Sequence, residues 1–86
     1  MNTLDHLMSE LEEVASELYD EGFDWAGIMI EEVAYQLDYG RIDEYEAARM
    51  LGLLARALVS YGASSEIISR IHELIDSMTT NIYIIA

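Results

Sequence analysis

The stretch DEYEAARMLGLLARALVSYG, residues 43–62, carries the signals for the start, the buried side and the end of one α-helix. Asp43 is followed three residues later by Glu46, a capping-box-like pair that opens helices. Small and leucine side chains then recur every three or four residues, at Ala47, Leu51, Leu54, Ala55 and Leu58. Gly62 ends the pattern, because glycine enters the left-handed C′ conformation without steric cost. A helix over about residues 44–61 is therefore predicted.

Three more segments have the same organisation and predict helices over about residues 3–21, 25–39 and 65–79. The expected N-caps of these helices are Asn2 or Thr3, Asp24 and Ser64, in chain order. Gly22 and Gly40 are the expected stops of the first and second helices. Their expected buried positions are Leu4, Leu7, Met8, Leu11, Val14, Ala15 and Leu18, then Ala26, Met29, Ile30, Val33 and Leu37, then Ile67, Ile68, Ile71, Leu74, Ile75 and Met78.

Short connections between such helices force antiparallel neighbours, so the whole chain, residues 1–86, is expected to be one all-α domain. The predicted fold is a compact antiparallel bundle of about four helices. Residues 80–86, TNIYIIA, are expected to form a short extended tail, because they are rich in isoleucine and tyrosine and leave no polar side. Such a tail either packs over the end of the bundle or pairs with a second copy or a partner's sheet edge.

The charge is strongly negative and unevenly distributed. The net charge is −13, and lysine is absent. Residues 1–40 contain eleven Asp and Glu with no Arg, whereas residues 41–86 contain six with four Arg. Direct nucleic-acid binding is excluded, because it requires cations that replace counterions on phosphates. Anionic membranes are disfavoured for the same reason, and a basic protein surface is the favoured partner.

No cofactor, metal site or catalytic group is expected. The chain has no cysteine, no signal-peptide pattern and no apolar run long enough for a membrane span, so an intracellular protein is predicted. Asp20, Asp24 and Glu31 fit positions 1, 5 and 12 of a calcium-binding EF-hand loop. Gly22 and Trp25 occupy positions 3 and 6, where an oxygen ligand and glycine are needed, so this site is rejected.

The acids form the main candidate site. At helical spacing, five of them form a row on the side of the first helix opposite its apolar stripe, with no lysine between them. On the second helix, Ile28 and Tyr35 project between acids, as apolar anchors do inside a charged interface rim. The alternative for Ile28 is packing on the fourth helix or the tail. The candidate partner-binding residues are Glu10, Glu13, Glu17, Asp20, Glu21, Asp24, Ile28, Glu31, Glu32, Tyr35 and Asp38.

In its size, its charge, its lack of lysine and its dense acidic run from Glu10 to Asp38, the chain resembles small acidic helical phage inhibitors. These anti-CRISPR and anti-restriction proteins block nucleic-acid-binding defence complexes. The resemblance implies that carboxylates replace phosphates in a basic channel and block it sterically, without chemistry, inside the host cell. The alternative is a homodimeric adaptor or regulatory module that binds through Ile28, Leu53 and residues 82–85, with the charge serving solubility.

Overall fold

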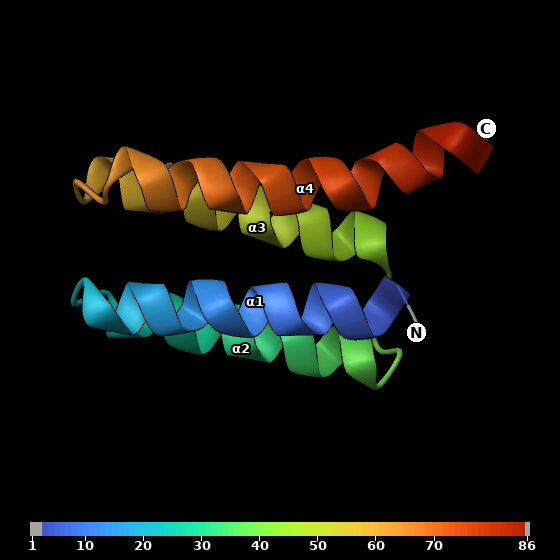
Figure 1. Cartoon of the computed structure of the whole chain (residues 1–86), viewed down its shortest axis with the longest axis horizontal. Helices are drawn as coiled ribbons and strands as arrows, with labels where there is room; N and C mark the ends of the chain where they lie inside the picture. The colour runs from blue at the N-terminus through green and yellow to red at the C-terminus, as the bar shows by residue number, and fades with distance from the viewer. Residues whose placement is uncertain (1–2, 86) are drawn as a thin grey trace.

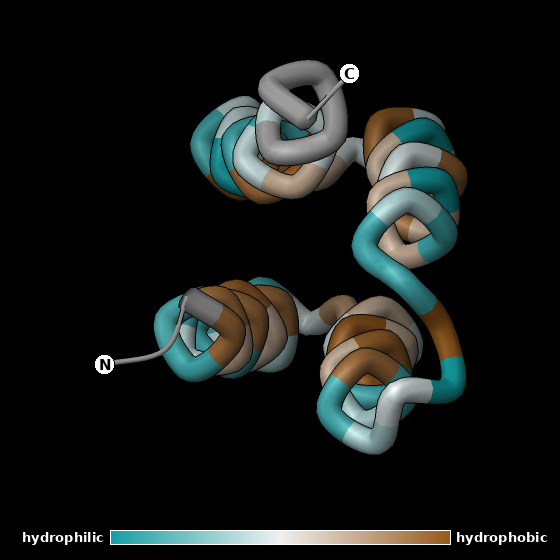
Figure 2. Tube along the Cα trace, turned by 90° about the vertical axis from the view of Figure 1, so that its right-hand side faces the viewer, coloured by the Kyte–Doolittle hydropathy of each residue, from teal (hydrophilic) through white to brown (hydrophobic). Residues whose placement is uncertain are grey.

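Each amphipathic segment forms a helix. The computed structural model describes residues 3–85, with side chains placed for residues 4–80. The helices are α1 Thr3–Asp20, α2 Asp24–Asp38, α3 Glu44–Ser60 and α4 Ser65–Ile85. Helices α1 and α2 form one layer and α3 and α4 the other (Figure 1), and the view along the bundle places them at the corners of a square (Figure 2). The predicted all-α antiparallel bundle is confirmed.

The core runs along the middle of the square. Its fully buried side chains come from all four helices and include Leu11, Leu18, Ile30, Leu51, Leu58, Ile67 and Ile71. The prediction that Met29 belongs to the core is wrong, because this side chain is 48% exposed. Gly27 and Ala34 of the same helix are buried instead. These two small residues allow α2 to turn its buried side toward α1, its most extensive packing partner, which leaves Met29 on the side near α3.

All three glycine stops are confirmed. Gly22, Gly40 and Gly62 have φ of 88°, 69° and 81°. After the first stop, the Phe23 N–H donates to the Leu18 carbonyl at 2.8 Å, and the equivalent bonds at the other two turns measure 2.9 and 3.0 Å. These are Schellman motifs, which satisfy the last carbonyls of a helix and reverse the chain direction within a few residues. The tight turns therefore make α1–α2 and α3–α4 antiparallel hairpins.

Two of the predicted N-caps are confirmed and one is wrong. The Asp43 Oδ1 accepts a hydrogen bond from the Glu46 N–H at 2.8 Å, and the Ser64 Oγ accepts one from the Ile67 N–H at 3.4 Å. Asp24 is instead the first helical residue, and Phe23 holds the cap position without a side-chain bond. The turn is so short that Phe23, whose N–H completes the Schellman motif at the end of α1, also occupies the N-cap position of α2. Asn2 lies outside the described residues.

The prediction of an extended tail is wrong for residues 80–85, because α4 continues to Ile85. The sequence after Gly62 contains no proline or glycine to stop the helix. Isoleucine and threonine in a helix cost only a few tenths of a kcal/mol each relative to alanine. Adding a turn to an existing helix also avoids the unfavourable nucleation step, so weak β-preference does not end it.

Two glycines inside helices provide a matched pair of variants. A Cβ at Gly27 would lie 2.9 Å from the Tyr19 ring and 3.1 Å from the Ala15 carbonyl oxygen, whereas a Cβ at Gly52 meets nothing within 4 Å. We expect Gly27→Ala to destabilise the protein by about 1–3 kcal/mol, because the Tyr19 ring must shift and the Ala15 carbonyl must move with it. Gly52→Ala should stabilise it by up to about 1 kcal/mol through helix propensity. Urea unfolding of both variants measures the difference, and equal shifts would contradict the close α1–α2 approach.

Candidate partner-binding surface

The predicted site residues on α1 lie on one face of the bundle, between α1 and α4. This α1–α4 face consists of Glu10, Glu13, Glu17, Asp20 and Glu21. Two shallow hollows run along it, and Arg70 of α4 lines both of them. The acidic row is therefore not a free edge of the molecule but one wall of the α1–α4 seam.

Arg70 compensates part of this row. Its Nη2 lies 3.2 Å from the Glu13 Oε2, and its Nη1 donates a hydrogen bond to the Glu17 Oε1. The row itself contains no lysine, but two of its acids are paired with a cation from α4. The compensating charge comes from another helix, more than fifty residues along the chain, where helical spacing in the sequence does not reveal it.

Most of the other acids on the α1–α4 face also have partners. The Glu10 Oε1 lies 2.7 Å from the His6 Nε2. Glu21 accepts hydrogen bonds from the Ser64 Oγ at 2.8 Å and from the Ser64 backbone N–H at 3.3 Å. Within the described part of the chain, only Asp20 of this row has no side-chain hydrogen bond or ion pair. The Glu21–Ser64 bonds hold the start of α4 against the end of α1, whereas the Glu10–His6 pair lies within α1.

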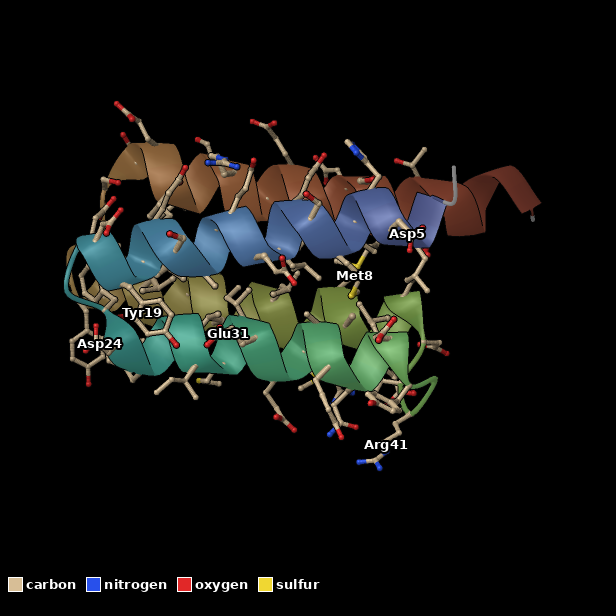
Figure 3. All side chains as sticks on the ribbon, turned by 60° about the horizontal axis from the view of Figure 1, so that its bottom comes forward. Asp5, Met8, Tyr19, Asp24, Glu31 and Arg41 are labelled. Carbon is tan, nitrogen blue, oxygen red and sulfur yellow. The ribbon has the colours of Figure 1, made fainter. Side chains whose placement is uncertain are left out.

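A second acidic surface lies between α1 and α2. This α1–α2 groove is lined by Met8, Glu12, Glu31, Ala34, Tyr35 and Asp38. Its apolar part consists of Met8 and Ala34 with the Tyr35 ring, and three carboxylates surround that part. Figure 3 shows this side of the molecule, with Met8 and Glu31 on neighbouring helices.

Sequence reasoning missed Glu12 as a member of this surface. Glu12 is exposed and lies four residues after Met8, and both residues line the groove on the side of α1 nearest α2. The spacing of Met8 and Glu12 is the signal in the sequence, but only the packing of α1 on α2 shows that this side of α1 belongs to a groove. Of the predicted residues, the groove brings together Glu31, Tyr35 and Asp38.

Tyr19 fixes the position of Glu31. The Tyr19 hydroxyl donates a hydrogen bond to the Glu31 Oε1 at 2.5 Å, joining α1 to α2 (Figure 3). The hydrogen bond to Glu31 is the main reason that the pKa of Tyr19 is raised from 10.0 to about 12, and desolvation and the charges of Glu31 and Asp24 add to it. A side chain held in this way presents its second carboxylate oxygen in a defined direction.

This raised pKa predicts a stability loss at high pH. Below pH 10 the phenol is protonated in both the folded and the unfolded state, so its contribution to folding is complete. Between pH 10 and about 12 the unfolded state loses the proton first, and stability falls. We expect Tyr19→Phe to lack this part of the pH dependence, whereas Tyr45→Phe, at an exposed position on α3, should retain it. Urea midpoints across this range measure it, and identical profiles would contradict the Tyr19–Glu31 bond.

The outer side of α2 carries aromatic groups beside one cation. The rings of Tyr35 and Tyr39 lie 4.5 Å apart, and the Arg41 guanidinium carbon lies 5.7 and 5.9 Å from their centroids. The Arg41 guanidinium therefore already lies over the ring of Tyr35, which lines the α1–α2 groove. Figure 3 shows Asp24 near the opposite end of α2 from Arg41.

Ile28 and Glu32 complete the predicted set on α2. Ile28 is 59% exposed, so the alternative that it packs on α4 does not hold. Glu32 accepts a hydrogen bond from the Gln36 Nε2 at 2.8 Å, one turn further along the helix. Both residues lie outside the α1–α2 groove.

Neither a protein-family model, nor a curated protein, nor a solved structure shows significant similarity to this chain. Within residues 3–85, no helix combines the length and apolar character needed to cross a membrane. The described side chains include no group of three or more His, Asp or Glu arranged to hold a metal ion.

Proposed function

We propose that this protein is an inhibitor that binds a basic nucleic-acid-binding surface of a partner through the α1–α2 groove. The observation that supports this most directly is the contrast between the two acidic surfaces. On the α1–α4 face, Arg70 compensates Glu13 and Glu17. The residues that line the α1–α2 groove include three carboxylates and no Arg or His.

The chemistry of the groove matches that of a phosphate backbone. Carboxylate oxygens accept the hydrogen bonds that Arg and Lys otherwise donate to phosphate oxygens, and Arg does so through two parallel bonds. Glu12, Glu31 and Asp38 offer several such acceptors around the apolar part of the groove. Tyr35 adds a ring against which a guanidinium stacks, as Arg41 already does. A basic surface would thus gain both charge pairing and apolar contact.

The overall charge favours the same kind of partner. A chain with a net charge of −13 repels itself and attracts a cationic channel over a distance set by the salt concentration. Closure of such a channel over the groove relieves repulsion among the carboxylates and excludes the nucleic acid without any reaction. The partner class that fits is a nucleic-acid-binding defence complex of the CRISPR or restriction type, with the protein made by a phage inside the host.

A displacement experiment tests this function. Purified CRISPR and restriction complexes, each bound to fluorescently labelled DNA, are titrated with the protein, and anisotropy follows release of the DNA. We expect release from at least one complex in 50 mM salt, with a steep loss of inhibitory potency by 200 mM, because ionic contacts weaken with salt. The function is contradicted if no complex releases its DNA, or if release is indifferent to salt.

A homodimeric adaptor or regulatory module is the second candidate. Ile28 on α2 and Leu53 on α3 are each 59% exposed, so both apolar side chains are available to contact a partner. Here the charge would serve solubility, and partner binding would survive high salt. The displacement experiment separates the two candidates, because the inhibitor releases DNA with a potency that falls as salt rises, whereas the module releases none.

A further inference from the structure

One side of the bundle, formed by α2 and α3, exposes much more apolar surface than an isolated small domain requires. This α2–α3 face is defined by six large side chains that are 38% to 70% exposed, namely Trp25, Ile28, Met29, Met50, Leu53 and Tyr61. The Trp25 and Tyr61 rings lie 5.5 Å apart, which ties the start of α2 to the end of α3.

The spacing of these residues makes the face continuous. Trp25 and Met29 are four residues apart on α2, and Met50, Leu53 and Tyr61 recur on α3 at spacings that helical geometry places on one side. Helices α2 and α3 pack on each other directly, although less extensively than α1 and α2 do. The apolar side chains on these two neighbouring helices therefore form one face and are not scattered singly.

The area suits a stable interface. Large side chains exposed to this degree present on the order of 600 Å² together, compared with about 800 Å² contributed by each partner in a standard protein–protein interface. Contacts around the edge of the face would supply the remainder. The aromatic and methionine content is also that of an interface core.

The charges indicate which partner covers this face. Three of the four arginines, Arg41, Arg49 and Arg56, lie on α3 or in the loop before it and balance the three acids of that segment, whereas α2 has acids and no cation. A basic partner would meet arginines here. A second copy related by a two-fold axis along the seam places α2 of one protomer against α3 of the other, so acids meet arginines on both sides.

We infer that the protein forms a homodimer through the α2–α3 face, with α2 of each protomer packed against α3 of its partner. Leu53 lies in the apolar centre of the interface, and Glu32 of one protomer pairs with Arg56 of the other at its edge. The α1–α2 groove and the α2–α3 face share no residue, so the dimer presents two grooves. Dimerisation is independent of the inhibitory function proposed above.

Sedimentation velocity of the full chain across a range of protein concentrations tests the dimer. We expect the mass of two chains, with association strengthened by salt, because each chain carries a net charge of −13. Leu53→Asp should weaken association by about 30-fold or more, as loss of a central apolar contact does. The matched control is Val59→Asp, since Val59 is 61% exposed on the side of α3 nearer α4. Circular dichroism confirms that both variants remain folded.

A charge exchange tests the orientation. Glu32→Arg and Arg56→Glu should each weaken the dimer by several-fold, and the chain carrying both changes should recover wild-type association, because the pair is restored with its signs reversed. A monomeric wild-type chain, or a Val59→Asp effect as large as that of Leu53→Asp, would overturn the dimer. Failure of the double variant to recover would overturn the packing of α2 against α3.

Discussion

Replacing Ile71 with alanine is expected to remove a large part of the stability of this protein. Ile71 lies in the middle of α4 with none of its surface exposed, and it belongs to the single core shared by all four helices. Shortening such a side chain costs about 2–5 kcal/mol, because the transfer energy is lost and a cavity remains. A chain of this size has a total stability of roughly 4–13 kcal/mol.

Thermal unfolding measures the effect. The midpoint of Ile71→Ala should fall by roughly 10–30 °C for a domain of this size. Val59→Ala is the control, since truncation of a side chain that is 61% exposed and lies outside the α2–α3 face should alter stability by less than about 0.5 kcal/mol. Similar midpoints for the two variants would contradict the placement of Ile71 in the core.

Neutralising the α1–α2 groove should have the largest effect on partner binding. The triple variant Glu12→Gln, Glu31→Gln, Asp38→Asn keeps the side-chain shapes and removes three charges. Each change is expected to weaken a charge-assisted hydrogen bond by about 1 kcal/mol, so the affinity for the complex found in the displacement experiment should fall about 100-fold. An amide oxygen still accepts the Tyr19 hydrogen bond, so the fold should be preserved.

The control variant carries the same change in net charge on the other side of the bundle, with Glu46, Glu66 and Glu73 each changed to Gln. These residues are exposed on α3 and α4, away from the groove. The control loses only long-range attraction, so its affinity should fall by no more than about five-fold. Equal losses in the two triple variants would show that the partner responds to net charge and not to the groove.

The helices could be predicted because their signals are local. The Asp43 cap and the glycine stops depend on residues within one or two turns, and their bonds form as expected. The extended tail failed because β-preference is weak beside the continuation of an existing helix. The exposure of Met29 depends on how α2 is rotated against α1, which close packing at Gly27 decides.

The candidate surface was only partly predictable for a similar reason. Acids on one helix can be counted from the sequence, but Arg70 reaches them from α4 through tertiary packing. The groove with Glu12, Glu31 and Asp38 exists only because two helices align with a particular rotation. The predicted acidic surface therefore divides into an α1–α4 face, where Arg70 pairs with two of the acids, and an α1–α2 groove whose lining residues include no Arg or His.

The most direct test of the groove as a binding surface is an NMR titration with a hepta-arginine peptide, with assigned methyl and aromatic signals. We expect the Met8 methyl and Tyr35 ring signals to shift together and to saturate, because guanidinium groups bind among the three groove carboxylates. Added salt should reverse these shifts. Shifts that instead centre on Val14 and Leu74, which line the α1–α4 side, would contradict the account.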